Sequence, residues 1–126
     1  MAAVPDFTIT VRPGHPDFLD LDWTRSVADW DSARVVDLPR GISRHVVRFV
    51  SYGQGIYAVK ELPTIPAHRD YEALRDLETA GAPAVMPVGL IDQRTSDQTA
   101  EASAALITKY EDFSFSFREL LSLIHI

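Results

Sequence analysis

Lys60 and Glu72 are the two side chains whose types and positions could do chemistry together. The stretch from Ile56 to Leu62 is rich in β-branched and aromatic residues, which predicts a strand. Alternation along a strand places Ala58 and Lys60 on the same face. Glu72 falls in the middle of the helix predicted next in the chain, where its carboxylate can pair with the Lys60 ammonium. An exposed pair contributes at most about 1 kcal/mol to stability. The function expected of such a pair is therefore to orient the lysine side chain.

The helix that follows this strand has signals at both ends. Pro66 lies just inside its start and Gly81 just past its end, which is the usual asymmetry of helix termini. Between them, one stripe of the helix carries the apolar residues Tyr71, Leu74 and Leu77. This stripe is expected to face the core.

Strands are predicted on both sides of that helix. Apart from the one around Lys60, the apolar or β-branched stretches are 35–38, 45–52, 85–91 and 104–108. Gly53, Gln54 and Gly55 predict a hairpin before the strand of Lys60. The order is three strands, one helix and two strands, which predicts an α+β fold with a five-stranded antiparallel sheet and one helix between strands three and four. Upstream, a short strand is predicted at 7–11 and short helical turns within 17–34.

The order of these elements resembles the small lobe of protein kinases, and residues match as well. Tyr57–Lys60 stands where kinases carry Val-Ala-Ile-Lys on the third strand. More closely, Leu38–Val50, Ala58–Lys60 and Arg69–Leu74 resemble the small lobe of bacterial lipopolysaccharide-kinase-like proteins. The resemblance covers about residues 35 to 120.

This resemblance implies a nucleotide site for ATP with Mg²⁺. Lys60 would hold the α- and β-phosphates, Glu72 would orient Lys60, and Ala58 would lie against the adenine ring. Residues 104–111 would form the fifth strand and the hinge of a kinase-like lobe. There, Lys109 and Tyr110 would offer backbone groups to the adenine edge.

The turn that would cover the phosphates departs from the kinase pattern. Kinases carry Gly-x-Gly-x-x-Gly, whereas Pro39–Arg44 contains one glycine. Phosphate would then be held by a shallow nest formed by Gly41, Ser43 and Arg44. The single glycine favours an alternative, a pseudokinase-like interaction module without phosphoryl transfer. A third hypothesis is a self-contained acidic α+β binding domain unrelated to kinases.

The large lobe that would carry the general base and the metal ligands is missing from the sequence. We therefore expect no catalytic residue in this chain. Phosphoryl transfer to a sugar or another small hydroxyl acceptor would occur in an intact parent, where the missing lobe is the partner. The expected divisions are an N-terminal extension (1–34), the small lobe (35–112), the start of the large lobe (113–120) and read-through of a transposon-derived sequencing adapter (121–126).

Two other patterns are interpreted as structural. His68-Arg69-Asp70 resembles a kinase catalytic loop, but that loop requires a later asparagine and the chain contains none. It is interpreted as the polar first turn of the helix. Trp23 and Trp30 are interpreted as residues of the core or of packing between lobes, because the acidic balance of the chain disfavours stacking on nucleic-acid bases.

The composition excludes further classes of function. Twelve Lys and Arg against eighteen Asp and Glu give a net charge of -6, the wrong sign for a nucleic-acid or anionic-membrane binder. Zero cysteines exclude disulfides and cysteine-based metal sites, and the four histidines lack ligand spacing. No stretch approaches the roughly 18 apolar residues of a membrane span. We expect a cytoplasmic protein without a metal site.

Overall fold

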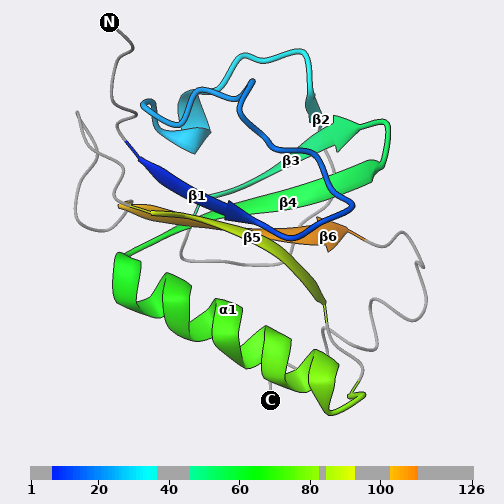
Figure 1. The fold of residues 1–126 in the computed structure, drawn as a ribbon. Coiled ribbons are helices and arrows are strands. Elements are labelled where there is room, and N and C mark those ends of the chain that lie inside the picture. Colours follow the sequence, from blue (N-terminus) through cyan, green and yellow to red (C-terminus); the bar gives the residue numbers. More distant parts are fainter. Residues whose placement is uncertain (1–6, 37–45, 83–84, 93–102, 111–126) are drawn as a thin grey trace, which may run out of the picture.

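The computed structural model describes residues 7–36, 46–82, 85–92 and 103–110. These residues form one helix, one 3₁₀ turn and an antiparallel sheet of six strands in the order β1-β5-β6-β4-β3-β2 (Figure 1). In chain order the elements are β1 (Thr8–Val11), η1 (Val27–Asp29), β2 (Val35–Val36), β3 (Val47–Tyr52), β4 (Gly55–Leu62), α1 (Thr64–Thr79), β5 (Met86–Asp92) and β6 (Ala104–Tyr110). The α+β class and the single helix between β4 and β5 are confirmed.

The sheet has one strand more than the five expected. β1, which confirms the strand predicted at 7–11, pairs antiparallel with β5 and adds a sixth strand to the sheet, with Val11 opposite Gly89. The two strands approach closely, because a Cβ atom at position 89 would lie 2.8 Å from the carbonyl oxygen of Thr10. Gly89 therefore permits the N-terminal strand to join the sheet.

Residues 12–34 cover one face of the sheet, on the side opposite α1 (Figure 1). The segment contributes the buried side chains Phe18, Leu21, Trp23, Val27 and Trp30 to the larger core cluster. The two indole N–H groups donate to the backbone carbonyls of Phe18 and Asp22, so neither is left unsatisfied on burial. Of the two interpretations of Trp23 and Trp30, the core placement is the one observed, and this N-terminal segment belongs to the same core as the sheet.

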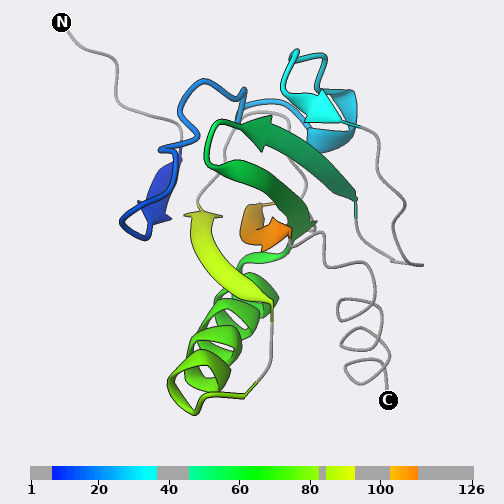
Figure 2. The same cartoon turned by 90° about the vertical axis from the view of Figure 1, so that its right-hand side faces the viewer.

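Helix α1 packs on the other face of the sheet. Its Ala67 and Tyr71 join Leu62, Leu90 and Leu106 from the strands in a second core cluster. Figure 2 shows α1 beneath β5 and β6, away from β2 and β3. The helix therefore covers only part of this face.

Both ends of α1 follow from its sequence. The helix begins at Thr64, so Pro66 lies in the first turn, where backbone N–H groups have no intrahelical acceptor. At the other end Gly81 has a φ of 74°, and the N–H groups of Gly81 and Ala82 donate to the carbonyls of Glu78 and Leu77. Within the described part of the chain, no helix has the length and apolar character needed to cross a bilayer.

Candidate functional site

Strand β4 presents Ala58 and Lys60 on the sheet face that carries α1. Both residues are half-buried, whereas the alternating Tyr57 and Val59 are fully buried on the opposite face. Lys60 lies opposite Leu106 in β6, and Leu106 belongs to the cluster beneath α1. The structure thus brings Ala58 and Lys60 together beside the helix, as the alternation of the sequence predicted.

The sheet surface around Ala58 and Lys60 extends beyond the area that α1 covers. Ala58 lies between Phe49 of β3 and Thr108 of β6, and none of the three belongs to the cluster that α1 covers. Lys60 lies between Val47 of β3 and Leu106 of β6. Lys60 therefore stands where the part of the sheet beneath α1 meets the part that α1 leaves uncovered.

Within the described ranges, the side chain of Lys60 makes no hydrogen bond or ion pair. A half-buried lysine can keep its aliphatic stem on apolar surface and its ammonium in water, and no carboxylate of the described residues forms an ion pair with this one. A half-buried ammonium of this kind can bind an anionic group such as phosphate.

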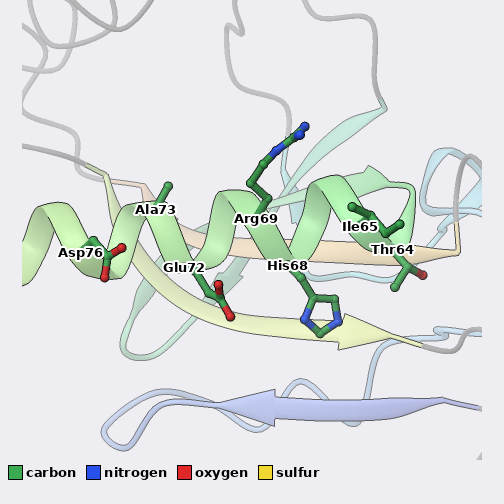
Figure 3. A pocket seen from close by; sticks show the side chains of 7 residues that line it. All are labelled: Thr64, Ile65, His68, Arg69, Glu72, Ala73 and Asp76. Carbon is green, nitrogen blue, oxygen red and sulfur yellow. The ribbon is translucent and has the colours of Figure 1, made fainter.

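Glu72 is exposed and forms no ion pair with Lys60. It lies on the same flank of α1 as His68, whose Nε2 is 2.6 Å from Oδ2 of Asp92 at the end of β5 (Figure 3). This flank faces β5 and β1, whereas Lys60 is on β4, beyond β6. The structure does not bring Lys60 and Glu72 together.

Asp70 lies on the other flank of the helix. Consecutive helical residues are about 100° apart, so Asp70 and Glu72 are on opposite sides of the buried Tyr71. Because Glu72 is on the flank facing β5, Asp70 is on the flank facing β4, and its side chain is half-buried. The sequence interpretation of a polar first turn missed this placement, since it depends on how the helix is rotated on the sheet.

A second polar group ties the start of α1 to the sheet. The Thr64 hydroxyl donates to Oδ1 of Asp92 at 2.9 Å and lies 3.0 Å from the hydroxyl of Ser103. Thr64 thus links the end of β5 to the residue before β6, and His68 gives Asp92 a second contact with α1. The i, i+4 spacing of Thr64 and His68 puts them on one helix face, but nothing local in the sequence indicates Asp92 as their partner.

A shallow hollow lies over the outer face of α1, next to this polar group (Figure 3). Among the described residues its lining comes from the helix alone, and it includes Thr64, Ile65, His68, Arg69, Glu72, Ala73 and Asp76. Glu72 thus belongs to an open helix surface. The described residues contain no group of three His, Asp or Glu side chains that could hold a metal ion.

Lys109 and Tyr110 lie at the end of β6, where they are still paired with Tyr57 and Ile56 of β4. Their side chains point to opposite faces of the sheet. Tyr110 shares the face of Ala58, and its ring contacts that of Phe49 with 5.3 Å between centroids. Lys109 shares the face of Tyr57, away from Lys60.

The surroundings of Lys109 include a half-buried histidine. Nδ1 of His15 is 3.0 Å from the hydroxyl of Tyr57, a residue with no exposed surface. Burial lowers the pKa of His15, and the positive charges of Lys109 and Arg12 lower this pKa further. His15 therefore links the N-terminal segment to β4 through its contact with Tyr57.

Gly41 and Ser43, expected to hold phosphate, lie outside the described residues, as does Arg44. The divisions expected at 113–120 and 121–126 also lie outside them. No family model matches this chain, and no curated protein or solved structure is significantly similar to it.

Proposed function

We propose that this chain is the nucleotide-binding small lobe of a kinase-like phosphotransferase. The observation that carries the proposal is the pairing of Ala58 and Lys60 on one half-buried face of β4, at the edge of the area covered by α1. The place of α1 between the third and fourth of the five predicted strands supports it as well. This arrangement is the one that the resemblance to lipopolysaccharide-kinase-like proteins implies.

In this proposal Lys60 neutralises the α- and β-phosphates of ATP, and Ala58 leaves room for the adenine ring. Mg²⁺ would neutralise further phosphate charge, and its ligands, with the general base, would come from a second lobe. That lobe would also bind the acceptor, a sugar or another small molecule with a hydroxyl group. A protein that uses ATP in this way would work in the cytoplasm.

A pseudokinase-like interaction module is the second candidate. Two observations favour it: the single glycine between positions 39 and 44, and the absence of an ion pair between Lys60 and Glu72. Such a module would keep the fold and the half-buried lysine without transferring phosphate.

The test is a calorimetric titration of Mg-ATP into this protein. Lys60→Ala should weaken binding at least tenfold, because it removes the charge that holds the phosphates. Lys109→Ala is the matched control, since this lysine lies on the opposite face of the sheet. Circular dichroism should show that both variants remain folded.

Absence of binding by a folded wild-type protein would contradict the nucleotide site. The interaction module would then be the better supported hypothesis. Equal losses in the two lysine variants would also contradict it, because they would indicate a general effect of charge. Binding that depends on Lys60 without phosphoryl transfer would favour the pseudokinase-like module.

A further inference from the structure

Helix α1 packs unevenly along its length. Its N-terminal half (64–71) contains both of its buried residues, Ala67 and Tyr71. In its C-terminal half (72–79) every residue except Leu74 is exposed, and Leu74 is only partly buried against the sheet. Apolar contact therefore holds the C-terminal half much less firmly than the N-terminal half.

The polar contacts of the helix show the same division. Thr64 and His68 tie the N-terminal half to Asp92 at the end of β5. In the C-terminal half, Glu78 is the one residue whose side chain forms a hydrogen bond or ion pair with another element of the described chain, and its partner is Arg12. This half is thus attached to the sheet by one half-buried leucine and one ion pair.

The ion pair between Arg12 and Glu78 has two hydrogen-bonding contacts. Nη2 of Arg12 is 2.6 Å from Oε1 of Glu78, and Nη1 is 3.1 Å from Oε2. Nη1 also donates to the carbonyl of Pro87 at 2.9 Å, and the backbone N–H of Arg12 donates to the carbonyl of Val88. Arg12 is therefore fixed at the start of β5, on the side of the molecule where α1 ends (Figure 1). The hydrogen bond from Arg12 lowers the pKa of Glu78, which favours the charged carboxylate.

We propose that the ion pair between Arg12 and Glu78 is a catch that holds the C-terminal half of α1 on the sheet, and that opening the catch frees this half while the rest of the domain stays folded. The two side chains are 30% and 38% exposed, so dissolved salt screens their attraction. The catch therefore opens more often as the ionic strength rises. It joins α1 to β5 and the end of β1, and it is separate from the proposed nucleotide site on β4.

The test is amide hydrogen exchange of this protein, measured by mass spectrometry on peptides from residues 76–82 and from β4. Glu78→Gln should speed exchange in 76–82 roughly twofold to fivefold, the range for a partly exposed ion pair, and leave β4 unchanged. Arg12→Gln should have the same effect, and the double variant should add nothing, because both substitutions open the same catch. Asp76→Asn is the matched control. It also removes a carboxylate from the C-terminal half, but one that forms no ion pair with a described residue, so it should not speed exchange.

Salt gives a second measurement that needs no substitution in the wild-type protein. Raising the salt concentration to about 0.5 M should speed exchange in 76–82 of the wild type and should not speed it in Glu78→Gln. Unchanged exchange in both single variants would overturn the proposal, because the ion pair would then not hold the helix. Equal acceleration in 76–82 and β4 would also overturn it, since the pair would then stabilise the whole domain. Effects of the two substitutions that multiply in the double variant would show that Arg12 and Glu78 act separately, which is equally incompatible with a catch.

Discussion

Among single residues, Asp70 and Glu72 differ in which strand they face. The resemblance to kinases assigned the lysine partner to Glu72, whereas the rotation of α1 places Asp70 on the flank toward β4. A rotamer change cannot carry Glu72 around the helix, whereas Asp70 already lies on the flank toward β4. Of these two carboxylates, the one at position 70 is on the flank toward the strand of Lys60.

We predict that Asp70→Asn raises the dissociation constant of Mg-ATP threefold to tenfold. A change of this size corresponds to the free energy of a partly exposed charge pair. Glu72→Gln should change the dissociation constant by less than about twofold, which matches the small effect of surface substitutions. Calorimetry on both variants, with the same protein as for Lys60→Ala, measures the difference. Weaker Mg-ATP binding by Glu72→Gln together with unchanged binding by Asp70→Asn would contradict this prediction. It would support the assignment of Glu72 that the resemblance implies.

His15 gives a second prediction for a single residue, about pH. Its pKa is lowered by burial, and also by Lys109 and Arg12, so the unfolded chain binds the proton more readily than the folded one. Stability from this group is therefore fully present above pH 6.5, the ordinary value, and is lost as the pH falls toward the lowered pKa. We expect wild-type protein to lose more thermal stability between pH 7.5 and pH 5.5 than His15→Gln.

Glutamine is suitable because its amide oxygen can accept from the Tyr57 hydroxyl and does not titrate. Thermal unfolding at four pH values in this range would measure the effect. If the unfolding temperatures of the two proteins fall in parallel as the pH is lowered, His15 contributes nothing to the acid sensitivity.

Among the elements, β1 depends on the absence of a side chain at Gly89. A Cβ atom there would meet the Thr10 carbonyl oxygen at 2.8 Å, and a backbone atom cannot move aside as a flexible side chain does. We predict that Gly89→Ala lowers the free energy of unfolding by about 1–3 kcal/mol, the usual cost of overpacking. Urea denaturation followed by circular dichroism measures it.

Gly53→Ala is the control for this substitution. Position 53 lies in the hairpin between β3 and β4, and a Cβ atom there would have no neighbour within 4 Å. It should change stability by less than about 0.5 kcal/mol. Equal effects of the two alanines would show that the close approach of β1 and β5 does not limit stability.

The elements also separate what the sequence could predict from what it could not. Pro66, Gly81 and the glycines of the hairpin are local signals, and they predicted the helix and the β3–β4 pair. The pairing of β1 with β5 joins distant segments, so an alternating pattern near the N-terminus could not indicate its partner. The rotation of α1 is also nonlocal: Leu77 of the predicted apolar stripe is 41% exposed, whereas Ala67 is fully buried.

The same distinction applies to the candidate site. Alternation alone placed Ala58 and Lys60 on one face, because the period of a strand is fixed. The flank of α1 that faces β4 depends on the packing of Ala67 and Tyr71 against the sheet, which the helix period does not specify. The contact between Phe49 and Tyr110 depends on strand order, since β3 and β6 become neighbours across β4 only in the assembled sheet.

For the whole molecule, the segment before β2 is part of the domain. Residues 12–34 cover Val50, Tyr57 and Val59, each of which has no exposed surface. The sequence suggested an N-terminal extension at 1–34 and a small lobe that begins at residue 35. A lobe cut at that boundary would expose the apolar sheet face that the aromatic residues of the segment bury, and it would lose β1.

We predict that a chain beginning at residue 35 does not fold on its own. Each buried Phe, Trp or Val of the segment contributes about 1.5–3 kcal/mol, and four such residues together approach the whole stability of a small domain. The truncated chain should aggregate or show a poorly dispersed NMR spectrum, whereas the intact chain should unfold cooperatively. Leu19→Ser is the control, since this leucine of the same segment is 56% exposed. A well-dispersed spectrum from the truncated chain would contradict this prediction. It would show that the remaining strands and α1 fold without the N-terminal segment.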